Sequence, residues 1–212
     1  MRLIGIYNAP AMVTLAGMAC AVGACWLALM GKAEFAVVAL IWAGIFDLFD
    51  GLVARRRQRS AVESAFGVQI DSLVDVLSFG ITPVMIAYAL GAQGPLALVV
   101  SLLYCTAVIQ RLAYFNVQQE EAQQSGSTGL RVYTGLPVTF AALIFSIGFS
   151  VYAFLPQAVF SIVASVLMLI VALLYVLPFK LPKPGGVVYV LMPLLALVFS
   201  GLWLWLGLME IR

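Results

Sequence analysis

Histidine is absent from this chain of 212 residues, and charged side chains make up only 9% of it. Soluble domains carry roughly 25% charged residues, so the composition excludes a water-exposed surface over most of the molecule. Mean hydropathy is +1.11. We therefore expect residues 1–212 to form a single integral-membrane domain, with no soluble domain and no nucleic-acid partner.

Cysteine is also scarce. Cys20, Cys25 and Cys105 all lie within apolar segments, which predicts packing residues rather than a disulfide or a metal site. The N-terminal stretch MRLIGIYNAP has one cation and no clear small-residue cleavage site. This pattern indicates an uncleaved first span rather than a signal peptide.

Long apolar runs recur along nearly the whole chain. Crossing a hydrocarbon core of ~30 Å takes about 20 helical residues. The sequence predicts an all-α, polytopic transmembrane helix bundle with about seven spans, near 10–30, 33–55, 66–90, 95–117, 136–154, 157–178 and 186–208. The most polar segment, 117–135, is expected to be a loop that is partly helical at its start.

Basic residues indicate the orientation. If the N-terminus is cytoplasmic, nine of the eleven Lys and Arg residues lie on the cytoplasmic side, and only Lys32 and Arg212 lie outside. The nine are Arg2, Arg55, Arg56, Arg57, Arg59, Arg111, Arg131, Lys180 and Lys183. This distribution follows the positive-inside bias and places both long basic breaks in the cytoplasm.

Acidic residues gather in one short stretch. The chain has nine, and five of them lie between Asp47 and Asp75. Asp47 and Asp50 are three residues apart, and Asp71 and Asp75 are four apart, so each pair shares one helix face with about 5 Å between its members. Both pairs are expected near the cytoplasmic ends of adjacent antiparallel helices, where they can face each other.

Four converging carboxylates repel each other unless cations neutralise them. An all-oxygen set suits Mg²⁺ or Mn²⁺, and the lack of histidine argues against zinc and copper. Two ions bridged by shared aspartates make the best use of Asp47, Asp50, Asp71 and Asp75 around a phosphate. The alternative is an interfacial ion-pair network between the aspartates and the arginines at 55–59.

Small residues flank the acidic positions. Gly51 follows Asp50, Ala54 lies one turn further on, and Gly67 lies one turn before Asp71. Both helices therefore lack bulk beside the carboxylates, which favours the approach of a large flat ligand. Close packing between the two helices is the alternative explanation for each glycine.

The pattern Asp47-x2-Asp50-Gly51-x2-Ala54-Arg55, followed by Gly67-x3-Asp71-x3-Asp75, resembles the signature of the CDP-alcohol phosphatidyltransferases. The spacer from Arg56 to Phe66 is longer than the form most often seen. The stretches DSLVDVLSFGITPVMIAY, QRLAYFN at 110–116 and TGLPVTFAA at 134–142 are similar to the CDP-diacylglycerol–serine O-phosphatidyltransferases within that family. The resemblance covers spans two to five.

The resemblance implies a six-helix core, a homodimer, and transfer of a phosphatidyl group from CDP-diacylglycerol to serine with release of CMP. It implies Asp75 as the base that takes the acceptor proton, beside its place among the metal ligands. The implied nucleotide-binding residues are Asp47, Gly51, Ala54, Arg55, Gly67 and Asp71. The other arginines, at 56, 57 and 59, are expected to set topology and contact the lipid surface.

The acceptor pocket departs from the pattern at one position. Tyr114 stands where phosphatidylserine synthases of this kind usually carry a second arginine, so Arg111 remains as the expected partner of a serine carboxylate. The alternative for Arg111 is an anchor that extends to the membrane surface. Sister enzymes using glycerol phosphate, inositol phosphate or choline remain open, as does a divalent-cation transporter, for which intramembrane aspartates are also expected.

Overall fold

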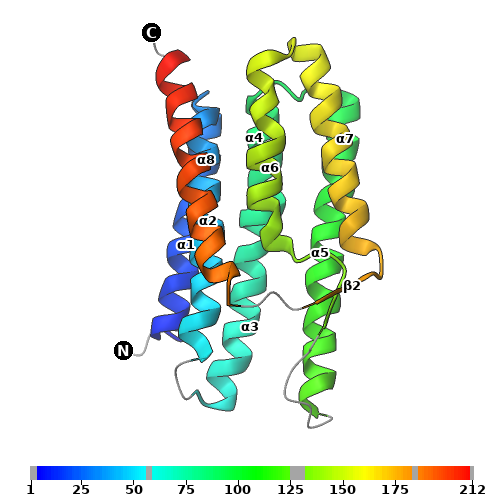
Figure 1. Ribbon diagram of the computed structural model, residues 1–212. Coiled ribbons are helices and arrows are strands. Elements are labelled where there is room, and N and C mark those ends of the chain that lie inside the picture. The colour runs from blue at the N-terminus through cyan, green and yellow to red at the C-terminus, as the bar shows by residue number, and fades with distance from the viewer. Residues whose placement is uncertain (1–3, 56–58, 125–131, 183–185, 211–212) are drawn as a thin grey trace.

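The computed structural model describes residues 4–55, 59–124, 132–182 and 186–210 and shows a bundle of long helices that run side by side (Figure 1). The chain forms α1 Ala9–Leu29, α2 Ala33–Arg55, α3 Ala61–Asp75, α4 Thr82–Ala89, α5 Pro95–Gln124, α6 Ala141–Phe149, α7 Gln157–Val176 and α8 Val188–Glu210. Short 3₁₀ turns, Val138–Phe140 and Ser150–Phe154, extend α6 at both ends. The expected all-α bundle is confirmed.

Local chemistry sets the helix ends. Asn8 caps α1 by accepting a hydrogen bond from the Ala11 amide at 3.1 Å. Ser60 and Glu63 form a reciprocal capping box at the start of α3. Gly31 and Gly91 adopt positive φ, at 73° and 108°, in the tight turns after α1 and α4. Glycine populates this region without steric cost, so these turns close in few residues.

The third span is longer than expected and is not uniformly α-helical. Residues Ala61–Ala89 form one continuous apolar helix, which begins five residues before the predicted position 66 because the capping box at Ser60 starts it. Its middle, Val76–Ile81, is π-helical. There the Thr82 amide donates to the Leu77 carbonyl, five residues back, and the Thr82 hydroxyl donates to the same oxygen at 2.9 Å.

Six helices of the described chain are long and apolar enough to cross a membrane. The predicted fifth span, 136–154, corresponds to the shorter helical stretch Val138–Phe154. The predicted helical start of the loop 117–135 is confirmed, because α5 continues to Gln124. One element was not predicted: β1 Val132–Thr134 and β2 Lys180–Pro182 form a short antiparallel pair that ties the chain before α6 to the chain after α7.

The core lies where α2, α5, α6 and α7 meet. Tyr104, Phe145 and Phe149 are fully buried there, and the Tyr104 hydroxyl donates to the Phe79 carbonyl in the π-helical turn. Helix α8 packs along α2, and the Trp203 indole donates to the Ser146 carbonyl at 2.9 Å. The last helix is thus held against the bundle by a buried polar contact as well as by apolar packing.

Gly44 marks the closest approach between α2 and α6. A Cβ at Gly44 would lie 2.8 Å from the Ala142 Cβ. Both carbons are fixed to backbone, so we expect Gly44→Ala to push the helices apart and lower the unfolding free energy by about 1–3 kcal/mol. Thermal unfolding in detergent measures this change. Gly23→Ala is the control, since nothing lies within 4 Å of a Cβ there; equal midpoints for the two variants would contradict the packing.

Candidate active site

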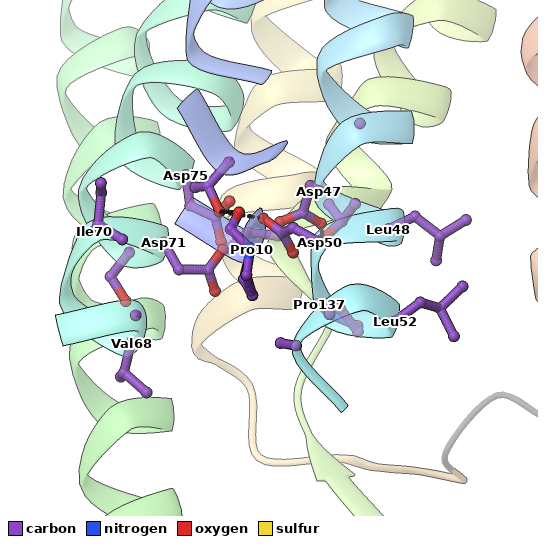
Figure 2. A pocket seen from close by; sticks show the side chains of 18 of the residues that line it. Pro10, Asp47, Leu48, Asp50, Leu52, Val68, Ile70, Asp71, Asp75 and Pro137 are labelled. Carbon is purple, nitrogen blue, oxygen red and sulfur yellow. Dashed lines mark hydrogen bonds between the residues drawn. The ribbon is translucent and has the colours of Figure 1, made fainter. Parts of the chain in front are cut away.

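The four predicted aspartates lie at one end of the bundle on adjacent helices. Asp47 and Asp50 project from α2 toward Asp71 and Asp75 on the neighbouring helix α3 (Figure 2). Carboxylate oxygens of Asp47, Asp71 and Asp75 all lie within 4.8 Å of one another. The i, i+3 and i, i+4 spacings therefore place both pairs on facing sides of the two helices.

Hydroxyl groups orient two of these carboxylates. The Thr139 hydroxyl donates to Asp47 at 2.7 Å, and the Thr14 hydroxyl donates to Asp50 at 2.7 Å. Asp50 lines the same pocket but is not a member of the group of three. Three predicted ligands therefore come together, and the fourth lies beside them with its carboxylate bound to α1.

Two of the four acids are almost fully buried. Asp50 and Asp75 are each only 7% exposed, and within the described residues none of the four aspartates forms an ion pair. Of the arginines in the alternative ion-pair network, the Arg55 side chain and residues 56–58 lie outside the described residues. Close, buried carboxylates repel, so the arrangement calls for a bound cation.

The donor set fits a hard divalent ion. Carboxylate oxygens gather at the site with the Thr139 hydroxyl behind Asp47. Oxygens on opposite sides of one Mg²⁺ are about 4.2 Å apart, because each bond is about 2.1 Å long. A spread of up to 4.8 Å between the three ligand atoms is close to that value, so the residues present suit Mg²⁺ or Mn²⁺.

A cavity of about 610 Å³ opens beside the aspartates. The predicted nucleotide-binding positions Gly51, Ala54 and Gly67 line it. Arg59 lines it too, and its guanidinium lies 3.3 Å from where a Cβ of Gly67 would be. The chain leading into α3 thus turns this side chain over Gly67, while its expected role in topology and lipid contact stays a prediction.

Arg111, on α5, also lines the cavity. It is 5% exposed, its Nε donates to the Leu136 carbonyl at 3.1 Å, and its guanidinium lies 5.3 Å from the centre of the Phe115 ring. This burial excludes the alternative of an anchor that extends to the membrane surface. The predicted acceptor residue therefore lines the same cavity as the aspartates.

Tyr114 does not share that face. It is 54% exposed, does not line the cavity, and accepts a hydrogen bond from Gln118 at 3.2 Å. Three residues along a helix amount to a rotation of about 300°, which leaves Tyr114 about 60° away from Arg111. At the edge of the cavity that rotation turns the side chain outward, so the expectation that position 114 belongs to the acceptor pocket is wrong.

Two further contributions were missed from the sequence. Asn116 donates to the Ser72 hydroxyl at 2.8 Å and so ties α5 to α3 beside Asp71. Helix α8 lines the cavity with Val188, Tyr189, Met192 and Ala196. Helix α8 carries no sequence signal of its own. Asn116 ends the stretch QRLAYFN, but its contact with Ser72 depends on packing between distant segments.

Several known proteins are similar in sequence to this chain. It is 39% identical over 108 residues to the CDP-diacylglycerol–serine O-phosphatidyltransferase of Saccharomyces cerevisiae, covering 50% of this chain and 38% of the relative. The mycobacterial protein of that name, from Mycobacterium bovis, is 30% identical over 67% of this chain and 49% of its own length. The Bacillus subtilis protein is 32% identical over 63% of this chain and 71% of its own.

The chain thus spans half or less of the yeast and mycobacterial relatives. A family model described as CDP-alcohol phosphatidyltransferase matches residues 7–177, which include both acidic pairs and Arg111. The match and the geometry of the aspartates agree: the chain belongs to the CDP-alcohol phosphatidyltransferase family.

Proposed function

We propose that this protein transfers the phosphatidyl group of CDP-diacylglycerol to L-serine, giving phosphatidylserine and CMP, with two Mg²⁺ or Mn²⁺ ions bound. The observation that carries this proposal is the group Asp47, Asp71 and Asp75, within 4.8 Å of one another, in a cavity that Arg111 also lines. The names of the yeast, mycobacterial and Bacillus relatives support serine as the acceptor.

In this reaction the serine hydroxyl oxygen attacks the phosphorus that bears the diacylglycerol. The bond from that phosphorus to the bridging oxygen breaks, and the pair of electrons leaves with CMP. Metal ions bound by Asp47, Asp50, Asp71 and Asp75 would supply charge neutralisation for the pyrophosphate and the leaving phosphate.

Asp75 is the proposed base. It is buried beside Asp47 and Asp71, and the described cavity offers no histidine to take the proton of the serine hydroxyl. Thr139 holds the Asp47 carboxylate in place while Asp75 stays available to the acceptor.

The cytidine nucleotide is proposed to lie along Gly51, Ala54 and Gly67, with Asp47 and Asp71 at its phosphates. Arg59, which covers Gly67, adds a cation on that side. Arg55 is proposed to reach the phosphates as well, although its side chain lies outside the described residues. The nucleotide and the acceptor then meet at the aspartates in one cavity.

We further propose that residues 1–212 act as one membrane domain, since helices from α1 to α8 all contribute to the bundle and the cavity is lined from both ends of the chain. The positive-inside distribution supports a cytoplasmic active site. The homodimer implied by the family resemblance stays a prediction, which mass measurement of the protein in detergent tests.

A panel of alcohols tests the acceptor. Purified protein with CDP-diacylglycerol and Mn²⁺ or Mg²⁺ is expected to release CMP with serine in preference to glycerol phosphate, inositol phosphate or choline. Preference for another alcohol would contradict serine as the acceptor and leave only the assignment to phosphatidyl transfer from CDP-diacylglycerol. Metal uptake into vesicles with no nucleotide requirement, and no CMP release with any alcohol, would support the transporter instead.

Arg111 is expected to hold the serine carboxylate. Arg111→Lys keeps the charge and loses the planar fork, so the KM for serine should rise roughly 5- to 150-fold, corresponding to about 1–3 kcal/mol, while the KM for CDP-diacylglycerol stays fixed. CMP release at varied concentrations of each substrate measures both constants.

Tyr114→Arg serves as the matched control on the same helix. Because Tyr114 faces outward, an arginine there is expected to leave the serine constant unchanged. A serine constant that responds to Tyr114→Arg and ignores Arg111→Lys would contradict this placement of the acceptor.

A further inference from the structure

Helix α8 lies beyond the family match, which ends at residue 177, and yet it forms part of the cavity wall. Val188, Met192 and Ala196 follow one another at four-residue spacing, so they lie on one face of the helix. The other face is exposed, with Leu194 at 59% and Leu197 at 61%. Helix α8 therefore turns one apolar stripe toward the cavity and another toward the membrane.

Side chains on two different sides of α2 line the cavity. Asp47 and Asp50 point toward α3, whereas Leu48 and Leu52 point away from it, to the opposite side of α2 (Figure 2). Ile45 also lines the cavity and lies about one turn from Leu48 on the apolar side. We name the apolar arm the set of cavity-lining residues on the side of α2 that faces away from α3, together with those of α8: Ile45, Leu48, Leu52, Val188, Met192 and Ala196.

The apolar arm runs in the direction of a lipid acyl chain and has a comparable length. From Val188 to Ala196 it runs eight residues along α8, about 12 Å, which approaches half of the ~30 Å hydrocarbon core. It begins at the end of the bundle that holds the aspartates and runs toward the middle of the membrane. These six residues carry no charge and no hydrogen-bonding side chain, and Tyr189, next to Val188, is the polar side chain that α8 adds to the cavity.

We propose that the apolar arm holds one acyl chain of the phosphatidyl donor and that α8 thereby determines which chain lengths are used well. This inference rests on the proposed function. The donor's pyrophosphate belongs at the aspartates, so its chains must leave the cavity toward hydrocarbon, and the arm is a continuous apolar path in that direction. Ala196, which is 2% exposed, forms its deep end.

The apolar arm is expected to help catalysis by positioning the donor rather than by burying its acyl chain. An acyl chain in the bilayer is already in apolar surroundings, so moving into the arm gains little hydrophobic free energy. A chain held between α2 and α8 instead fixes the phosphorus relative to the aspartates, and a displacement of about 1 Å at the reacting atoms can cost as much as 10²-fold in rate.

The test compares dioleoyl and dioctanoyl CDP-diacylglycerol as donors. Ala196→Phe fills the deep end, so the ratio of kcat/KM for the long donor to that for the short donor is expected to fall about 10-fold, with the KM for serine unchanged. Ala196→Leu is a milder form of the same change. Leu197→Phe is the matched control, because the neighbouring position faces the membrane.

A second measurement needs no variant. A donor carrying a diazirine near the end of one acyl chain, photolysed with the unmodified protein, is expected to label residues of α8 between 188 and 196. Labelling confined to other helices would overturn the proposal, as would an equal donor ratio in Ala196→Phe, Ala196→Leu and Leu197→Phe. If the proposal is overturned in either way but both donors still release CMP, the proposed function stands. If neither donor releases CMP, both the proposed function and this inference fail.

Discussion

Replacing Asp71 by Ala is expected to lower the rate of CMP release by at least ~10²-fold. Asp71 shares its site with Asp47 and Asp75 within 4.8 Å, so its loss removes a ligand and with it about 3 kcal/mol or more of transition-state stabilisation. Asp47→Ala and Asp50→Ala are expected to have similar effects. Steady-state turnover with Mn²⁺ or Mg²⁺ measures all three.

Chelation and a distant carboxylate provide the controls. Excess chelator should abolish turnover, and added Mg²⁺ or Mn²⁺ should restore it. Glu34 is also buried, but it lies in the first turn of α2, at the helix end opposite to the aspartates, where it accepts a hydrogen bond from Tyr152 at 2.6 Å. Glu34→Gln keeps that acceptor and should retain turnover; full activity of the unmodified protein in excess chelator would exclude the metal site.

Asp75→Asn is expected to separate binding from chemistry. The amide keeps the size of the side chain but cannot take a proton, so the chemical step should fall by roughly 10²–10⁴-fold while CDP-diacylglycerol still binds. Single-turnover CMP release measures the chemical step, and equilibrium binding of the donor measures affinity.

The two roles of Asp75 predict different outcomes. If donor affinity falls as far as the rate of the chemical step, Asp75 is chiefly a metal ligand and the base lies elsewhere. Asp71→Asn is the matched variant, because Asp71 belongs to the same group of three but is not the proposed base. It should weaken metal and donor binding together with turnover.

Spacing alone was enough to predict the acidic group. On two neighbouring antiparallel helices, Asp47 and Asp50 on one and Asp71 and Asp75 on the other can face each other only if each pair occupies a single face, and the i, i+3 and i, i+4 intervals ensure this. Hydropathy likewise placed most ends of the long helices to within a few residues, since the membrane thickness limits their length. The largest differences are the start of α3 at Ala61, five residues before the predicted position, and the end of α5 at Gln124, seven residues beyond it.

Positions that depend on contacts between distant segments could not be predicted. Arg59 lies within a spacer of unusual length, and only the course of the chain into α3 brings it over Gly67. Tyr114 differs from Arg111 by a rotation of about 60°, which decides between cavity and membrane only once the neighbours of α5 are known. Helix α8 carries no motif, and its place in the cavity wall follows from its packing on α2.

The π-helical turn at Val76–Ile81 changes how residues should be counted along the third span. A hydrogen bond from Thr82 to Leu77 spans five residues, so this turn contains one residue more than an α-helical turn does. The acidic half before it and the core-packing half after it are each regular, but their residue numbers are offset by one. A relative with one residue fewer between Asp75 and Thr82 can therefore present the same two faces on an unbroken α-helix. An ungapped alignment of the two proteins would misplace either the aspartates or the core.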